Sequence, residues 1–230
     1  MRLISYTKSC IEQADTPADL IAYCARVSNP SNQELNEGCE RLIKYLIKHK
    51  HWSPLEMVDV TIEIEPTRDI GRQILRHWSF TFQEFSQRYA SVADMNDMFE
   101  LSECRMQDTK NRQNSLKCND SELEKWWLDT QQKVIDLTRQ KYLEALEKGI
   151  AKELARKVLP EGLTKTRMYM KGSIRDWIHY LELRSGEETQ KEHRLIAVNI
   201  AKVILDIFPI NTGVLHERIA SSIESVWSSY

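Results

Sequence analysis

The chain has 230 residues, of which 41% are hydrophobic, so it is long enough to bury the core of one sizeable domain. Its formal net charge of −2 argues against a general nucleic-acid-binding protein, because such proteins need an excess of Lys and Arg. No apolar run is long enough to cross a bilayer, and residues 1–16 lack the apolar core of a signal peptide, so we expect a cytoplasmic protein without a membrane partner.

Hydrophobic periodicity predicts several helices and a few strands. The clearest strand covers residues 57–65, where valine and isoleucine alternate with polar residues, so that one face is buried and the other is solvated. Thr16 precedes a proline and caps a helix. Ser121 and Glu124 form a Ser-x-x-Glu capping box for the longest helix. In chain order we expect an edge strand over 2–7, a helix from 16 to a break at 29–32, a helix over 34–50, the strand over 57–65, a helix over 67–77, a polar loop over 94–121, a long helix over 121–148 ended by Gly149, a short helix over 151–157, a strand over 164–171, a helix over 173–183, and a helix over 190–208 followed by a short helical tail.

No internal repeat and no change of composition divides the chain. Many helices with few strands predict an α+β fold. We therefore expect a single domain over residues 1–230, with a small mixed or antiparallel sheet flanked by several helices, one of them long.

Cysteine and glycine usage excludes several kinds of site. The five cysteines are scattered and form no CxxC pair, so we expect free thiols and no metal site. The seven glycines form neither a GxGxxG nor a GxxxxGK[ST] motif. A nucleotide would then be bound by Arg, Lys and Ser side chains and by helix ends, rather than by a Rossmann turn or a P-loop.

The segment over residues 67–89 combines cationic side chains with aromatic rings. Arg68, Arg72 and Arg76 are four residues apart, so they lie along one helix face, and positions 70–83 contain no acidic residue to neutralise them. Guanidinium groups bind phosphates through paired donors, and aromatic rings pack against a base or a flavin. The pattern indicates a site for a planar, phosphorylated ligand. A solvated arginine face beside core aromatics is the alternative.

This segment resembles the signature of the flavin-dependent thymidylate synthases. The family pattern is R-H-R, two variable positions, S, a variable position, N-E, a variable position, S, a variable position, R-Y. Six residues within fourteen positions match it: Arg76, His77, Glu84, Ser86, Arg88 and Tyr89. The chain departs from the pattern at three positions, with Trp78 for the second arginine, Thr81 for serine and Gln83 for asparagine.

Three further segments resemble family motifs and occur in the expected order. Residues 51–56 resemble H-x-[ST]-P-x-E, residues 155–160 resemble A-R-x-x-L-P, and residues 172–184 resemble the helix that closes the family's site. Alone, His51 would be a capping or core histidine, and Arg156 a surface arginine at a helix end. Together, the four segments cover nearly the whole chain up to about residue 208.

The resemblance implies a role for particular residues. Arg184 is the residue implied to be catalytic, because its charge would stabilise negative charge on the pyrimidine. His179 stands where many members of the family carry asparagine. Cofactor binding is implied for Ser53, Arg76, His77, Trp78, Glu84, Ser173, Arg175 and His179. Substrate binding is implied for Gln73, Arg76, Glu84, Ser86, Gln87, Arg88, Arg156 and Arg184.

The resemblance also implies a reaction and an assembly. The expected reaction methylates dUMP to dTMP, with methylene-tetrahydrofolate as the carbon donor and FAD, reduced by NADPH, as the reductant. No cysteine lies in a segment that resembles the nucleophile motif of classical thymidylate synthases. The resemblance to the flavin-dependent family implies a reaction without a protein nucleophile. The expected assembly is a homotetramer in which several subunits contribute to each site. The residues expected to converge only after assembly are Ser53, Arg76, Ser86, Arg88 and Arg184.

Two other functions are compatible with the same residues. One is hydroxymethylation or another flavin- and folate-dependent modification of dUMP or dCMP. The other is a non-catalytic nucleotide-binding paralogue that has lost its flavin, a reading that Trp78 favours. Product analysis with dUMP and dCMP separates the first from methylation. The absorption bands of a flavin in the purified protein argue against the second.

Overall fold

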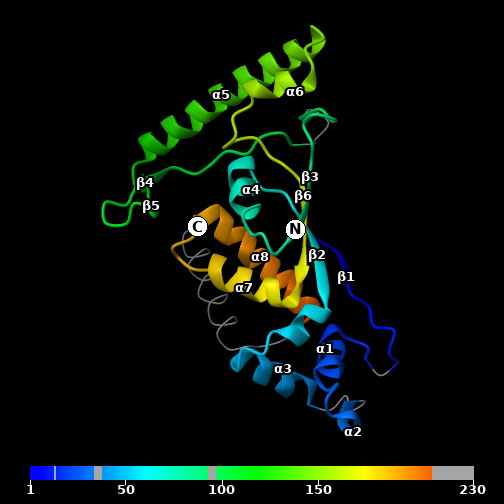
Figure 1. The fold of residues 1–230 in the computed structure, drawn as a ribbon. Helices are drawn as coiled ribbons and strands as arrows, with labels where there is room; N and C mark the ends of the chain where they lie inside the picture. The colour runs from blue at the N-terminus through cyan, green and yellow to red at the C-terminus, as the bar shows by residue number, and fades with distance from the viewer. Residues whose placement is uncertain (13, 34–37, 93–96, 209–230) are drawn as a thin grey trace. The chain divides into compact units, whose positions relative to one another are not determined.

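The computed structural model describes residues 1–12, 14–33, 38–92 and 97–208 (Figure 1). The chain divides into two compact units that are interleaved in sequence. Unit 1 comprises Met1–Ile64, His77–Phe82 and Tyr169–Tyr230, and unit 2 comprises Glu65–Arg76 and Gln83–Met168. The single domain expected over 1–230 stays a prediction.

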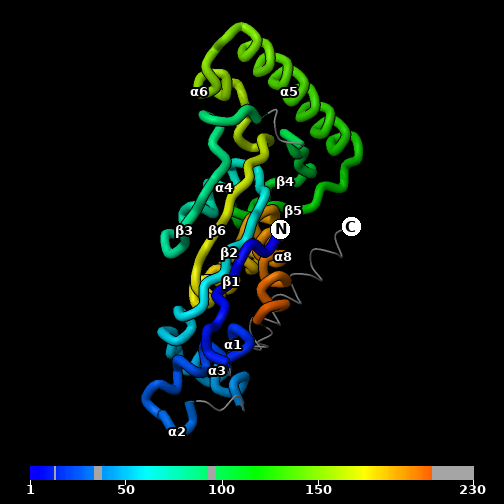
Figure 2. The backbone as a smooth tube through the Cα atoms, turned by 90° about the vertical axis from the view of Figure 1, so that its right-hand side faces the viewer, coloured from blue at the N-terminus to red at the C-terminus, as the bar shows by residue number. Residues whose placement is uncertain are grey.

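A four-stranded sheet organises unit 1, and its strands follow the order β1-β2-β6-β3 (Figure 2). Strand β1 lies at an edge, as predicted, and pairs antiparallel with β2. The alternation predicted around residues 57–65 is confirmed, because Val60, Ile62 and Ile64 are fully buried and the residues between them are half-buried. The strands are β1 Arg2–Tyr6, β2 Asp59–Ile64, β3 Thr81–Glu84 and β6 Met168–Ser173; the last two residues of β3 and the first of β6 are counted with unit 2.

Helices complete unit 1. The predicted Thr16 cap is confirmed, since Thr16 and Asp19 form a reciprocal capping box at the start of α1. Helix α7 is tied to the sheet by the Trp177 indole, whose Nε1 donates to the Val60 carbonyl at 3.2 Å, and α8 lies beside α7 (Figure 1). The helices are α1 Pro17–Ala25, α2 Pro30–Gln33, α3 Cys39–Lys48, the 3₁₀ helix η1 Ser53–Met57, α7 Ile174–Arg184 and α8 Lys191–Ile207.

Unit 2 is built around the long helix α5. Its core contains Phe99, Ile135 and Tyr142, and the Tyr142 hydroxyl accepts from the backbone N–H of Val92 at 3.1 Å. This bond fixes the loop that follows the aromatic segment onto α5. The elements are α4 Arg68–Ile74, β4 Arg105–Gln107, β5 Ser115–Lys117, α5 Ser121–Glu147, α6 Lys152–Ala155 and the 3₁₀ helix η3 Arg156–Val158.

Several element boundaries differ from the prediction. Helix α3 begins only at Cys39, because Gly38 has a left-handed backbone (φ 75°) that a helix does not continue through; residues 34–37 lie outside the described residues. Helix α4 ends at Ile74, so Arg76 does not share its face with Arg68. The helical tail expected after residue 208 also lies outside the described residues.

Two further boundaries also differ from the prediction. Helix α5 is capped by Asp120 rather than Ser121, because the Asp120 carboxylate accepts from the backbone N–H groups of Glu122 and Leu123. The strand expected over 164–171 begins at Met168.

The polar segment 94–121, expected to be a loop, contains the antiparallel hairpin β4–β5. The amide of Gln107 stabilises it by donating to the carbonyls of Asp108, Arg112 and Asn114 at 3.0–3.3 Å. The carboxylate of Asp108 accepts from the backbone N–H groups of Lys110 and Asn111. A polar composition therefore builds strands here, because side chains supply the turn's hydrogen bonds.

Among the helices of the described residues, none has both the length and the apolar character that crossing a bilayer requires. Within the same ranges, no three His, Cys, Asp or Glu side chains are grouped in a way that would bind a metal ion. All five cysteines are free thiols.

Replacing Gly172 with alanine is expected to lower the free energy of unfolding by about 1–3 kcal/mol, because a Cβ at this position would lie 2.6 Å from the ring of Phe80. Phe80 is buried and packs edge-on against Trp177 at 4.7 Å, so the ring has little room to move. Urea unfolding measures the change. Gly162→Ala is the control, since no atom lies within 4 Å of its added Cβ. Equal midpoints for both variants would contradict the expectation.

Candidate functional site

A cationic pocket of about 240 Å³ lies in unit 2. Helix α4 contributes Arg68 and Arg72, which are four residues apart and therefore share a face, as their spacing predicted. The remaining lining residues come from the turn after β3 and from residues 156–161. The complete lining is Arg68, Arg72, Gln87, Arg156, Lys157, Leu159 and Glu161. Four cations face one carboxylate, so the pocket favours an anion.

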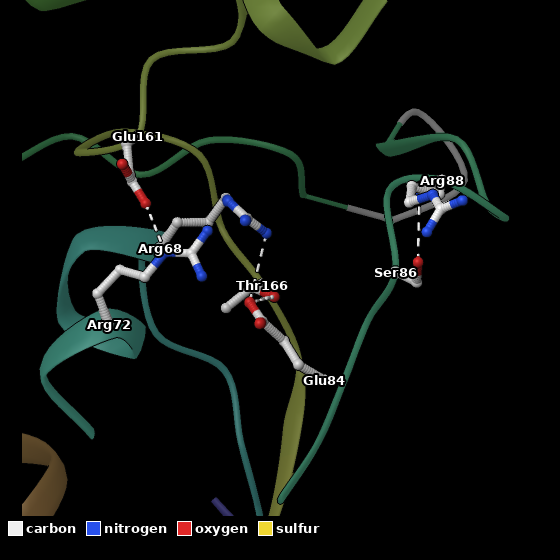
Figure 3. A network of polar contacts seen from close by, with 7 residues as sticks. All are labelled: Arg68, Arg72, Glu84, Ser86, Arg88, Glu161 and Thr166. Atoms are coloured by element: carbon white, nitrogen blue, oxygen red, sulfur yellow. Dashed lines mark hydrogen bonds and ion pairs between the residues drawn. The ribbon is translucent and has the colours of Figure 1, made fainter. Parts of the chain in front are cut away.

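Arg68 is a largely buried cation of the pocket, with 12% of its side chain exposed. Its Nη1 donates to Oε1 of Glu84 at 3.3 Å, and the same oxygen accepts from the Thr166 hydroxyl at 3.0 Å (Figure 3). Burial lowers the pKa of Arg68, and the charge of Glu84 offsets part of this effect. A guanidinium has a very high ordinary pKa, so Arg68 stays protonated at neutral pH. Glu84 and Thr166 thus fix the direction of Arg68.

Arg72 is more exposed and is already paired. Its Nε donates to Oε1 of Glu161 at 2.8 Å, and this hydrogen bond raises the pKa of Arg72 (Figure 3). Both side chains are about half exposed, with 55% and 53% of their surface accessible, so an anionic ligand could displace Glu161 at little cost.

Gln87 provides a buried donor to the same pocket. Only 4% of the residue is exposed, and its amide Nε2 has no hydrogen-bond partner within the described residues. A buried amide without a partner costs about 1–3 kcal/mol. An acceptor oxygen of a bound ligand would satisfy it.

The residues beside Gln87 are ordered by local bonds. The hydroxyl of Ser86 accepts from the backbone N–H of Arg88 at 3.4 Å, as Figure 3 shows, and Arg88 Nε lies 3.5 Å from the carboxylate of Glu153. Arg156 Nε donates to the Glu153 carbonyl at 3.3 Å, which leaves the rest of the Arg156 guanidinium for the pocket.

Unit 1 carries a second group of predicted residues, on and around α7. Ser173 caps α7: its hydroxyl donates to the Asp176 carboxylate at 2.6 Å and accepts from the Asp176 backbone N–H. Arg175 forms an ion pair with Glu56 of η1. Cap and ion pair fix the N-terminal turn of α7.

Further along α7, two polar side chains meet aromatic neighbours. The His179 ring packs edge-on against Trp52, with centroids 4.4 Å apart, beside the exposed Ser53. At the end of the helix, Arg184 Nε donates to His77 Nε2 at 3.0 Å. The next residue, Trp78, is 93% exposed, so its indole is available to a ligand.

Comparison with known proteins decides the family. The sequence profile of a family described as thymidylate synthase complementing protein matches residues 2–210. The chain belongs to this family. The family expected from the four sequence segments is therefore confirmed.

Relatives within the thymidylate synthase complementing family match over most of their length. A protein of Paramecium bursaria Chlorella virus 1, named as a probable flavin-dependent thymidylate synthase, is 49% identical over 208 residues, which cover 90% of this chain and 94% of the relative. A flavin-dependent thymidylate synthase of Synechocystis sp. (strain ATCC 27184 / PCC 6803 / Kazusa) is 50% identical over 212 residues, covering 91% and 95%.

The fold is also similar to a solved structure. The UMP/dUMP methylase PolB from Streptomyces cacaoi, bound with 5-Br dUMP, superposes with a TM-score of 0.74 at 21% identity, covering 96% of this chain and 93% of that chain. At this level of identity the likeness concerns the fold, and the predicted α+β class is confirmed.

The family motifs predicted only part of the unit 2 pocket. Of the expected substrate residues, Gln87 and Arg156 line it, Glu84 holds Arg68, and Ser86 and Arg88 adjoin Gln87 in sequence. Gln73 and Arg76 are not among its lining residues. Arg68 and Arg72 were missing from the expected substrate residues, although their spacing pointed to a phosphorylated ligand.

Proposed function

We propose that this protein methylates dUMP to dTMP, taking the carbon from methylene-tetrahydrofolate and the electrons from FAD that NADPH reduces. The cationic pocket of unit 2 carries the proposal, because Arg68, Arg156 and the unpaired amide of Gln87 are the donors that a nucleotide phosphate needs. The names of the viral and cyanobacterial relatives support the same activity.

The pocket's role is to bind and orient the nucleotide. A 5′-phosphate is a dianion with several acceptor oxygens, and charge-assisted bonds from guanidinium groups are about twice as strong as neutral ones. Arg68, fixed by Glu84, needs no reordering when the ligand binds. A phosphate held in this way fixes one end of the substrate.

Arg184 is proposed to act on the pyrimidine. When carbon is transferred to C5 without a protein nucleophile, negative charge builds up on the ring, and a fixed cation stabilises it. The Nε of Arg184 is taken by a neutral acceptor, His77, rather than by a carboxylate. The full positive charge and the Nη donors of Arg184 therefore remain for the substrate.

The chemistry of unit 1 suits a flavin. Ser53 and His179 supply polar atoms beside an indole, Arg175 supplies a cation, and Trp78 offers an exposed ring. We propose that these residues hold FAD, which supplies the two reducing electrons when it is bound. Ser173 is committed to its helix cap through both its hydroxyl and its backbone N–H, which bind Asp176, so its proposed role is to fix the start of α7 beside the flavin.

Product analysis tests the function directly. The purified protein is incubated with FAD, NADPH, methylene-tetrahydrofolate and either dUMP or dCMP, and the nucleotides are identified by mass. We expect dTMP from dUMP and no product from dCMP. A hydroxymethylated product, or a modified dCMP, would show that the protein has the related modifying activity instead of methylating dUMP. A protein that binds dUMP but no flavin would be the non-catalytic paralogue.

Replacing Arg156 with alanine is expected to raise the KM for dUMP about 10- to 100-fold, the effect of losing one hydrogen bond to a charged group. The kcat should change much less, because the phosphate does not react. Steady-state kinetics at varied dUMP measures both. Arg41→Ala, at an exposed position of α3, is the control. An unchanged KM would place the phosphate elsewhere.

Replacing Trp78 with alanine is expected to weaken FAD binding about tenfold, a loss within the range for one stacked aromatic ring. The midpoint of thermal unfolding of the flavin-free protein should stay the same, because the side chain is 93% exposed. Flavin fluorescence titration gives the affinity, and Trp78→Phe, which keeps a ring, should lie between. Wild-type affinity in Trp78→Ala would exclude contact between this residue and the flavin.

We further propose a homotetramer in which several subunits contribute to each site. The absence of a dinucleotide-binding glycine motif in the sequence supports this, because side chains of several subunits can replace such a motif. Light scattering on protein that is turning over dUMP tests it. A monomer with full activity would contradict the proposal.

A further inference from the structure

Two buried polar side chains in unit 1 have no role in the reaction described so far. Tyr180 of α7 is 1% exposed and His193 of α8 is 0% exposed. The Tyr180 hydroxyl and His193 Nε2 are 3.0 Å apart and share a hydrogen bond. Such a pair in a core is costly unless it is satisfied, and two apolar residues could fill the same volume. Its position next to His77 and Arg184 suggests what it does.

The first contact leads from Arg184 to His77. A guanidinium has only donors, so His77 Nε2, 3.0 Å from Arg184 Nε, must accept. The His77 ring is then neutral and carries its proton on Nδ1. If the ring turned over, a C–H group would take the place of Nε2 opposite Arg184 and the hydrogen bond would be lost. The orientation of His77 therefore decides the direction of Arg184.

The second contact leads from His77 to Tyr180. The two rings pack edge-on, with centroids 4.9 Å apart and planes at 76°. An edge-on neighbour restricts rotation of the His77 ring, provided that the Tyr180 ring itself is fixed. The bond to His193 fixes it, since the hydroxyl cannot move away without leaving a buried polar atom unpaired.

Of the four side chains Arg184, His77, Tyr180 and His193, one carries a charge. Burial, together with the smaller effect of the Arg184 charge, lowers the pKa of His193 to about 3, so the ring is neutral at physiological pH. Burial raises the pKa of Tyr180, so its hydroxyl is neutral as well. Arg184 is thus the one cation among these four side chains.

We propose that Tyr180 and His193 are positioning residues, which hold the His77 ring so that its Nε2 faces Arg184 and thereby aim the Arg184 guanidinium at the substrate's pyrimidine. This inference rests on the proposed function, because the pyrimidine is the ligand assigned to Arg184. It adds two buried residues, from α7 and α8, that act through His77.

Binding measurements with two ligands test the proposal. dUMP carries the pyrimidine and the phosphate, whereas 2-deoxyribose 5-phosphate carries the phosphate without the base. In Tyr180→Phe, calorimetry should show dUMP affinity reduced about tenfold and the affinity for the sugar phosphate unchanged. Equal losses for both ligands, or no loss for either, would overturn the inference.

A double variant separates positioning from stability. Tyr180→Phe with His193→Leu removes both members of this hydrogen bond, so neither is left without the other and the thermal midpoint should recover toward the wild type. The KM for dUMP should nevertheless stay raised by about the same factor, since His77 is still not held. The single variant His193→Gln, which keeps a polar partner for the Tyr180 hydroxyl, should retain much of the wild-type affinity for dUMP. A double variant with wild-type KM would show that the pair is merely structural.

The outcome also distinguishes this inference from the proposed function. If the wild-type protein binds no dUMP, the proposed function fails, and the inference fails with it. If the wild type binds dUMP and forms dTMP while Tyr180→Phe does the same with unchanged constants, only the inference fails.

Discussion

Replacing Arg184 with alanine is expected to lower kcat/KM for dUMP by about 10²–10³, the typical loss when one preorganised charge-stabilising donor is removed. The reason lies in the Arg184 environment. Its Nε is held by a neutral histidine at 3.0 Å, so the guanidinium is fixed without being neutralised. Most of the loss should appear in kcat, because the negative charge on the pyrimidine is larger in the transition state than in bound dUMP.

Steady-state kinetics with purified, FAD-saturated protein measures this effect. Arg184→Lys should recover only part of the rate, because an ammonium group keeps the charge but lacks the planar fork. Lys133→Ala, at an exposed position of α5, is the control for loss of a positive charge. A kcat within threefold of the wild type in Arg184→Ala would remove this residue from the mechanism.

The free energy of unfolding should fall by up to about 5 kcal/mol as the pH drops from 6.5 to 3, because His193 has a folded-state pKa of about 3 and an ordinary value of 6.5. The sign follows from proton binding. Above pH 6.5 the ring is neutral in both states and costs nothing. Between pH 6.5 and 3 the unfolded chain binds a proton that the folded protein rejects, so the folded state loses stability as the pH falls.

Urea unfolding at a series of pH values measures this dependence, and the difference between wild type and His193→Leu isolates the contribution of one residue. The variant should have a flatter profile between pH 6.5 and 3, even if it is less stable at pH 7. Parallel profiles would show that His193 titrates normally in the folded protein.

Hydrophobic periodicity predicted the elements that bury one face in the core and expose the other to water. The strand β2 shows why, since burial alternates along it as the valines and isoleucines do. The helix caps were predicted only in part. Thr16 caps α1 as predicted, but Asp120 takes the cap of α5 from Ser121, because one carboxylate reaches two backbone N–H groups there. Which of two neighbouring capping residues is used depends on backbone angles that the sequence does not specify.

The hairpin β4–β5 could not be predicted from hydrophobic alternation. Its strands have three residues each and are largely exposed, so no buried face leaves a pattern. The hairpin is stabilised by the Gln107 amide and the Asp108 carboxylate, which form hydrogen bonds with the backbone of the turn. Polar residues of this kind look the same in a mobile loop and in a fixed turn.

For the candidate site, the motifs identified residues but not their partners. Arg156 and Gln87 were predicted from the family motifs and line the cationic pocket together with Arg68. Tyr180 and His193 were missed, because both have the helical spacing of core residues and a buried histidine leaves no signal in one sequence. Their hydrogen bond and the neutral state of His193 depend on how the two consecutive helices α7 and α8 pack together, which the sequence alone does not specify.

The interleaving of the two units restricts how the chain can be cut or rearranged. The backbone passes between them at residues 64–65, 76–77, 82–83 and 168–169. A single proteolytic cut at any one of these junctions would leave the two units connected by the three other junctions. No contiguous gene fragment encodes either unit alone, so recombination between relatives cannot exchange unit 2 in one crossover without also carrying part of unit 1.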